Sequence, residues 1–222
     1  STLDDPSIHL TVERGGVHRA GTNGAGVWVT GPVSRGRFEV SLTDAGGVVG
    51  VKFRVGGVVA FGDRDLGAVR DRTVPARAWF GERTPAGDLP LDAQRAASVL
   101  DAWLLSLAPR EPSGSASFRH ALEVLESPDV TSLAALAERT GMSVRTLQRL
   151  FRRFAGVGAK RMLVRARVMD AVAAIDRGDP RSMTALASDL GWFDQPHFVR
   201  DFRTITGETP GGYAERDRGV AP

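Results

Sequence analysis

The sequence of 222 residues contains no cysteine. This absence excludes disulfides, thiolate zinc sites, iron–sulfur clusters and cysteine nucleophiles, and it suits a reducing, cytoplasmic location. No apolar run approaches the roughly 18 residues that a membrane span needs, so we expect no membrane partner. Histidine is scarce too: His9 and His18 have no acidic partner at ligand spacing, and His120 lies on a lone predicted helix, so we expect neither a metal site nor a cofactor.

Motifs of common enzyme classes are also missing. The sequence has no GxxxxGK and no GxGxxG after a strand, and its glycines in the N-terminal half read as turn residues. No Ser/His/Asp set or carboxylate pair can be argued from spacing. We therefore expect a protein that is not an enzyme.

Charge is distributed unevenly along the chain. Residues 1–114 hold 13 basic and 13 acidic side chains, so the whole net charge of +3 lies in residues 115–222. Residues 139–181 alone carry 11 basic and three acidic side chains. This block predicts a polyanion partner for the C-terminal half, although a solvated helical face would also account for it.

The N-terminal half has the texture of a small antiparallel β-domain. Glycine-rich turns are predicted at 15–16, 21–24 and 45–47, between strands at 8–12, 26–29, 37–42 and 48–55. About six strand candidates are few for a closed barrel, so we expect the domain to be truncated at its start. A short helix is predicted at 63–69, and a longer one at 91–107 whose buried face holds Ala96, Val99, Leu100, Trp103, Leu104 and Leu107.

A linker is predicted at Pro109–Ser117, which is rich in proline, glycine and serine. It divides the chain into a β-rich sensory or oligomerisation domain (1–112) and an all-α domain (113–222), an α+β protein overall. Helices are predicted near 118–125, 132–140, 144–155, 159–177, 183–190, 195–206 and 210–216.

The helical half contains an internal repeat. Leu136-Ala137 and Gly141 recur 50 residues later as Leu186-Ala187 and Gly191. Each copy reads as a helix, a glycine turn and a second helix, with Ser143 or Asp194 as the predicted N-cap of that second helix. The pattern favours helix-turn-helix units near 132–155 and 182–206 over two ordinary helical hairpins.

One continuous helix is predicted between the two copies. At about 1.5 Å per residue, residues 159–177 span roughly 28 Å. Successive major grooves on one face of B-DNA are about 34 Å apart. The helix is therefore long enough to hold two recognition helices about one DNA turn apart.

These motifs resemble the DNA-binding domain of the AraC/XylS family of bacterial transcription regulators. The matching residues lie between Thr131 and Arg216 and include Ser132–Ala137, Gly141-Met142-Ser143, Leu147–Phe151, Arg165, Gly191-Trp192, Asp194-Gln195, His197-Phe198, Arg200, Phe202, Gly207, Thr209-Pro210 and Tyr213. The resemblance implies seven helices with two helix-turn-helix units. The pieces 50–57 and 71–75 are also similar to the effector-binding β-domains of some members.

The first turns of the two second helices are the candidate readers of bases. In the first copy these are Arg145, Gln148 and Arg149, which the family resemblance also assigns; in the second copy they are Gln195, His197 and Arg200. Pro196 and Val199 cannot donate to a base, so the first unit is expected to set most of the specificity. Phosphate contacts are assigned to Ser143, Arg152, Arg153, Lys160, Arg161, Arg165 and Thr209.

The leading hypothesis is a sequence-specific transcription regulator that binds double-stranded DNA at a bipartite site. Its N-terminal half would sense a small-molecule effector, mediate a homodimer, or both, and an activator would also contact RNA polymerase. Two alternatives stay open. One is an enzyme or small-molecule-binding β-domain with a DNA-targeting tail, and the other is a nonspecific architectural DNA binder.

Overall fold

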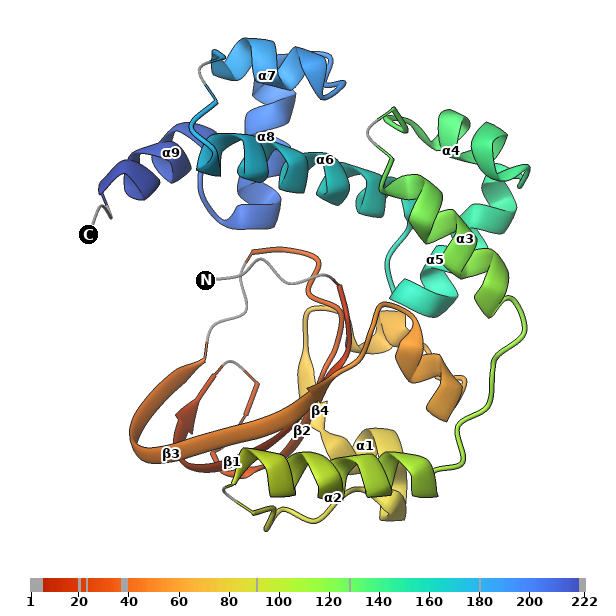
Figure 1. Cartoon of the computed structure of the whole chain (residues 1–222), viewed down its shortest axis with the longest axis vertical. Coiled ribbons are helices and arrows are strands. Elements are labelled where there is room, and N and C mark those ends of the chain that lie inside the picture. Colours follow the sequence, from red (N-terminus) through yellow and green to blue (C-terminus); the bar gives the residue numbers. More distant parts are fainter. Residues whose placement is uncertain are drawn as a thin grey trace.

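A computed structural model describes residues 6–19, 21–22, 24–36, 40–90, 92–127, 129–179 and 181–219. An antiparallel sheet with short helices forms the N-terminal part, and helices form the C-terminal part (Figure 1). The predicted α+β fold class is therefore confirmed.

The sheet holds four strands in the described part of the chain, in the order β3-β1-β2-β4. β1 pairs antiparallel with both neighbours, so that Leu10 lies opposite Val29 on one side and Val51 on the other. Side chains alternate along β1, and its residues Leu10 and Val12 enter the hydrophobic core. The strands span His9–His18 (β1), Gly26–Thr30 (β2), Ser41–Lys52 (β3) and Thr73–Pro75 (β4).

Two of the predicted turns are wrong, because their glycines lie inside strands. Gly15-Gly16 falls within β1, where the register is irregular and Gly15 has a φ of +64°. Residues 45–47 fall within the long strand β3. A Cβ on Gly16 would lie 2.5 Å from the Thr43 carbonyl oxygen. These glycines therefore permit a bulge and a close approach of two backbones, which turn-based reading does not anticipate.

The other strand predictions have mixed outcomes. The strands at 8–12 and 26–29 are confirmed by β1 and β2, and 21–24 falls in the connection between them, with residue 23 outside the described residues. Residues 37–39 of another predicted strand also lie outside them. The strand predicted to reach residue 55 ends at Lys52.

Short helical elements follow the sheet. They are η1 (Gly57–Phe61), η2 (Leu66–Val69), α1 (Ala76–Phe80), η3 (Gly81–Arg83) and α2 (Ala93–Ser106). The predicted helix at 63–69 is reduced to the 3-10 turn η2. The predicted helix at 91–107 is confirmed by α2, but Val99 is 44% exposed and does not belong to its buried face, because only the narrow stripe around Ala96 and Leu100 packs inward.

Helices in the C-terminal part match the predicted ranges to within about three residues. They are α3 (Ser115–Leu125), α4 (Leu133–Thr140), α5 (Val144–Ala155), α6 (Ala159–Asp176), α7 (Met183–Asp189), α8 (Gln195–Thr206) and α9 (Pro210–Gly219). Both predicted N-caps are confirmed: Ser143 Oγ accepts from Thr146 N at 3.1 Å, and Asp194 Oδ1 accepts from His197 N at 2.7 Å.

The hydrophobic core crosses the domain boundary predicted at residue 112. One cluster of buried side chains runs from the sheet through α3, α4 and α5 to the start of α6. Phe118 of α3 stacks on Phe154 of α5 at 5.0 Å between ring centroids, and a Cβ on Gly56 would lie 2.7 Å from the Phe118 ring. A second cluster joins the end of α6 to α7, α8 and α9. The first helical unit is therefore packed on the N-terminal part.

Candidate DNA-binding surface

The first helix-turn-helix unit consists of α4 and α5. Leu147, Leu150 and Phe151 bury one face of α5 in the core. The opposite face leaves Arg145, Gln148 and Arg149 exposed, and the structure gives these side chains no hydrogen bond or ion pair within the described residues. This surface offers three directional donors to an external partner.

The second unit consists of α7 and α8. Gln195, Pro196 and Arg200 are exposed on α8, whereas Val199 is half-buried. Gln195 Oε1 accepts a hydrogen bond from Thr184 Oγ1 at 3.0 Å. His197 Nε2 lies 3.2 Å from Asp201 Oδ2 one helical turn later. Two of the three predicted readers on α8 therefore already have partners inside the unit.

α6 is the shared support of both units (Figure 1). Its 18 residues correspond to about 27 Å at the α-helical rise. Leu163 belongs to the first core cluster and Val168 to the second, so the helix is packed at both ends. Arg167 lies over the Trp192 ring, 4.5 Å from its centroid, and donates to the Gly191 carbonyl at 2.8 Å. Burial lowers the pKa of Arg167.

The residues assigned to phosphate fall into four environments. Arg152 and Lys160 are exposed. Ser143 and Thr209 are helix caps, since Thr209 Oγ1 accepts from Gly212 N at 3.2 Å. Arg165 is buried, with 8% of its surface exposed, in the wall of a cavity.

Arg153 and Arg161, the remaining two, contact the N-terminal part. Arg153 makes two hydrogen bonds to the Asp63 carboxylate, at 3.1 and 2.9 Å, and a third to the Ser113 carbonyl at 2.8 Å. Arg161 Nε donates to the Ser34 carbonyl at 3.3 Å. Sequence reasoning missed these contacts because the partners are 90 and 127 residues away along the chain.

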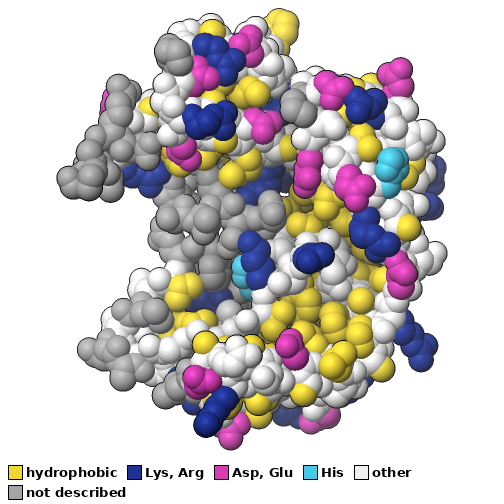
Figure 2. Space-filling view, in the orientation of Figure 1, with side chains coloured by type: hydrophobic (Ala, Val, Ile, Leu, Met, Phe, Trp, Pro, Cys, Tyr) yellow, Lys and Arg dark blue, Asp and Glu magenta, His cyan; other side chains and the backbone are white. Residues whose placement is uncertain are grey.

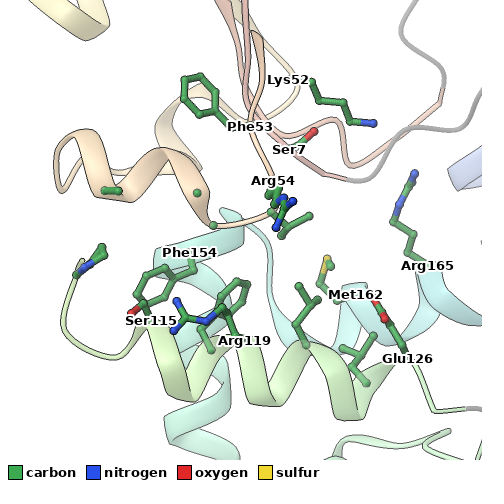
Figure 3. Close-up of a pocket in the computed structure, with 18 of the residues that line it drawn as sticks. Ser7, Lys52, Phe53, Arg54, Ser115, Arg119, Glu126, Phe154, Met162 and Arg165 are labelled. Carbon is green, nitrogen blue, oxygen red and sulfur yellow. The ribbon is translucent and has the colours of Figure 1, made fainter. Parts of the chain in front are cut away.

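A cavity of about 910 Å³ lies where the sheet part meets α3 and α6. Figure 2 shows hydrophobic side chains in the hollow between these parts. Lys52 is the last residue of β3, Arg54 follows it in the chain, Arg119 comes from α3 and Arg165 from α6 (Figure 3). The apolar lining includes Phe53, Val55, Phe118, Leu122, Leu125, Phe154, Met162 and Met169.

Three acidic side chains, those of Glu111, Glu126 and Asp170, line this cavity beside five basic ones. Glu111 is held by hydrogen bonds from Arg119 and Ser115, which lower its pKa. Burial raises the pKa of Asp170. The cavity has apolar walls and several cations, and the Glu111 carboxylate is already paired with Arg119. These features suit a ligand with a hydrophobic body and an acidic group.

A buried ion pair in the sheet was not anticipated. Arg19 Nη2 lies 2.5 Å from Glu13 Oε1, and both side chains are 1% exposed. Arg19 also donates to Thr11 Oγ1 at 2.7 Å and to Thr30 Oγ1 at 2.9 Å. The alternation of Thr11 and Glu13 with the apolar side chains of β1 is the signal that could have indicated a second, polar face. The network ties β1 to β2.

The described part of the chain holds no group of three or more His, Asp or Glu side chains that could bind a metal ion. None of its helices is long and apolar enough to cross a membrane.

Comparison with known proteins gives one family match within the helical part. Residues 136–216 match the family described as "Helix-turn-helix domain". The XylDLEGF operon transcriptional activator 3 of Pseudomonas putida is 33% identical over 106 residues, which are 44% of this chain and 30% of that protein. The chain therefore spans less than a third of the length of this relative.

Two solved structures are similar to this chain. A transcriptional regulator from Chromobacterium violaceum, described as having an AraC-type DNA-binding domain, is 21% identical; it aligns over 50% of this chain and 100% of its own, with a TM-score of 0.44. ToxT from Vibrio cholerae O395 is 11% identical and aligns over 97% of this chain and 91% of its own, with a TM-score of 0.47.

Proposed function

We propose that residues 136–216, which match a helix-turn-helix family, are a DNA-binding domain of the AraC type, and that the chain is a sequence-specific transcription regulator. The observation that carries the proposal is the pair of recognition helices, α5 and α8, packed on one rigid helix of about 27 Å. The similarity to a named transcriptional activator supports it. We assign the chain no enzyme activity and a cytoplasmic location.

Base reading is assigned unequally to the two units. Arg145, Gln148 and Arg149 are exposed on α5 with their donors directed to the outside, so they read base edges in the first major groove. In the second unit Gln195, His197 and Arg200 are the readers, but only Arg200 lacks a partner within the described residues. The first unit therefore supplies most of the sequence specificity.

Phosphate contacts hold the duplex but carry no sequence information. Arg152 and Lys160 are the exposed cations for this role, with the backbone amides next to the caps Ser143 and Thr209. Arg161 reaches the duplex from the junction with the N-terminal part. Arg153 would first have to release Asp63, and Arg165 acts at the cavity instead.

The test of this proposal is a selection of duplexes from a random pool by the full chain, followed by competition with bulk DNA. We expect one selected duplex to bind at least 1,000 times more tightly than bulk DNA at physiological salt. Equal affinity for both would leave the nonspecific architectural binder as the better account. No binding to either would refute the DNA-binding role.

The cavity at the junction is the proposed effector site. Its walls come from both parts of the chain, so a ligand there contacts the sensory part and the first helix-turn-helix unit together. Its chemistry favours an amphipathic carboxylate. Alkyl carboxylates of eight to sixteen carbons should raise the unfolding temperature, whereas the matched alcohols should raise it less. Equal shifts would mean that the cations play no part in binding.

Self-association and polymerase contact complete the proposal. A homodimer would be formed through the N-terminal part, and if the protein is an activator it also contacts RNA polymerase. Equilibrium sedimentation of the full chain checks the first statement, and transcription from a selected site with purified polymerase checks the second.

A further inference from the structure

The loop that follows β2 is fixed firmly within the N-terminal part. The Asp71 carboxylate accepts hydrogen bonds from Ser34 N at 2.6 Å and from Ser34 Oγ at 2.7 Å. The backbone reinforces this, since Asp71 N donates to the Pro32 carbonyl at 3.0 Å and Gly31 N to the Arg72 carbonyl at 2.9 Å. Asp71 itself has a φ of +55°, an uncommon geometry that these contacts hold in place.

The same loop also contacts the second helix-turn-helix unit. Gly36 N donates to the Thr204 carbonyl of α8 at 2.9 Å, and the Ser34 carbonyl accepts from Arg161 of α6. Arg35 therefore stands between two residues that are both attached to the helical part. Its own side chain is exposed.

Arg35 joins three arginines of the helical part around one hollow. Arg161, Arg200 and Arg203 line the hollow with it, and Gln195 and Thr209 lie at the same surface. No acidic residue of the described chain lines this hollow, and the structure gives Arg35, Arg200 and Arg203 no ion pair among the described residues. Burial lowers the pKa of Arg161 and the charge of Arg35 lowers it further, whereas the carboxylates of Asp71 and Asp201 act in the opposite direction.

Such a gathering of like charge is unfavourable for the isolated protein and attracts a polyanion. The hollow runs along the outward stripe of α8, formed by Pro196, Val199, Arg200 and Arg203. A recognition helix in a major groove lies between the two phosphate strands of the duplex. A cation on a neighbouring element beside the helix thus faces a strand rather than a base edge.

We propose that Arg35 is a phosphate contact for the duplex held by the second helix-turn-helix unit, so that the N-terminal part binds DNA directly. This inference rests on the proposed DNA-binding function. It assigns the second unit a source of affinity outside the helical part. It leaves base choice to α5 and α8, because a phosphate contact carries no sequence information.

The test compares three variants with the unmodified chain: R35A, R35K and R95A. Arg95 is the matched control, because it is an exposed arginine of α2, in the sheet part. Binding to a 40-base-pair duplex of random sequence is measured by fluorescence anisotropy between 50 and 300 mM salt. Circular dichroism melting curves confirm that all variants are folded.

We expect R35A to reduce the slope of log K against log salt by about one unit and to weaken binding by about 3- to 10-fold at 0.1 M salt. R35K and R95A should keep the slope of the unmodified chain. An unchanged slope for R35A in a chain that binds DNA would overturn this inference alone. Tighter binding by R35A would show that the loop obstructs the duplex. Failure of the unmodified chain to bind at any salt would refute the proposed function as well.

Discussion

Two glycines at equivalent positions of the repeat offer a matched test of how the N-terminal part is packed. Gly156 ends α5 and Gly207 ends α8, and both adopt left-handed backbone geometry, with φ of +68° and +86°. A Cβ on Gly207 would meet nothing within 4 Å. A Cβ on Gly156 would lie 2.8 Å from Leu66 Cβ and 2.9 Å from Pro32 Cγ.

Replacing either glycine by alanine therefore costs the same backbone strain, but only the change at Gly156 also creates a steric contact. Gly207→Ala should lower the free energy of unfolding by about 1–2 kcal/mol, which is the cost of left-handed geometry for an L-residue. Gly156→Ala should lower the free energy of unfolding by the same backbone cost and by about 1–3 kcal/mol more, because η2 and the loop after β2 must move away from α5. Its total effect is thus about 2–5 kcal/mol.

Urea unfolding of the full chain, followed by circular dichroism, measures both values. The difference between the two variants isolates the contact of α5 with the N-terminal part, since the backbone strain is common to both. If Gly156→Ala destabilised the protein no more than Gly207→Ala, the continuous core between sheet and first helix-turn-helix unit would be refuted.

Three further predictions concern single side chains. Arg149→Ala should weaken binding to the selected duplex by about 1–3 kcal/mol and relax preference at one or two base pairs, as measured by titration against all single-base variants of the duplex. The control is Arg203→Ala, which removes an exposed arginine one turn beyond Arg200 and should leave base preference unchanged. Lys160→Ala should weaken binding to all duplexes alike and flatten the salt dependence by about one unit, and sequence-dependent weakening would contradict the phosphate role. Hydrogen bonds from Arg181 lower the pKa of Asp179 to about 2, so this pair stabilises the fold above about pH 4 and its contribution disappears as the pH falls toward 2; Asp179→Asn should reduce that part of the acid sensitivity in pH-dependent melting curves.

The helical half was predictable because its signals are local. The caps Ser143 and Asp194 and the left-handed Gly141 act on residues within one turn of themselves, so sequence spacing locates each helix end. Exposure of Arg145, Gln148 and Arg149 followed from the helical period, because Leu147, Leu150 and Phe151 occupy the opposite face.

The sheet was harder to predict, because a glycine has the same sequence signature in a turn and in a strand. Gly16 and Gly46 lie in strands because each faces a neighbouring backbone, a contact that depends on pairing between residues about 30 apart. Amino-acid composition does not give the register in which β1 pairs with β3, so the bulge in β1 and the length of β3 could not be predicted from the sequence.

The junction between the two parts lay beyond sequence reasoning for a similar reason. Arg153 and Arg161 have the same local surroundings as other arginines of the basic block, and only the folded chain brings them to Asp63 and Ser34. Arg165 shows the reverse case: its place in the helical pattern suggested a surface cation, but it lies buried in the wall of the cavity.

Hydroxyl-radical footprinting of the full chain on its selected duplex tests the central claim most directly. Two recognition helices held by one helix of about 27 Å should protect two patches on one face of the duplex, centred about 10 base pairs apart. A single protected patch, or two patches on opposite faces, would contradict the account.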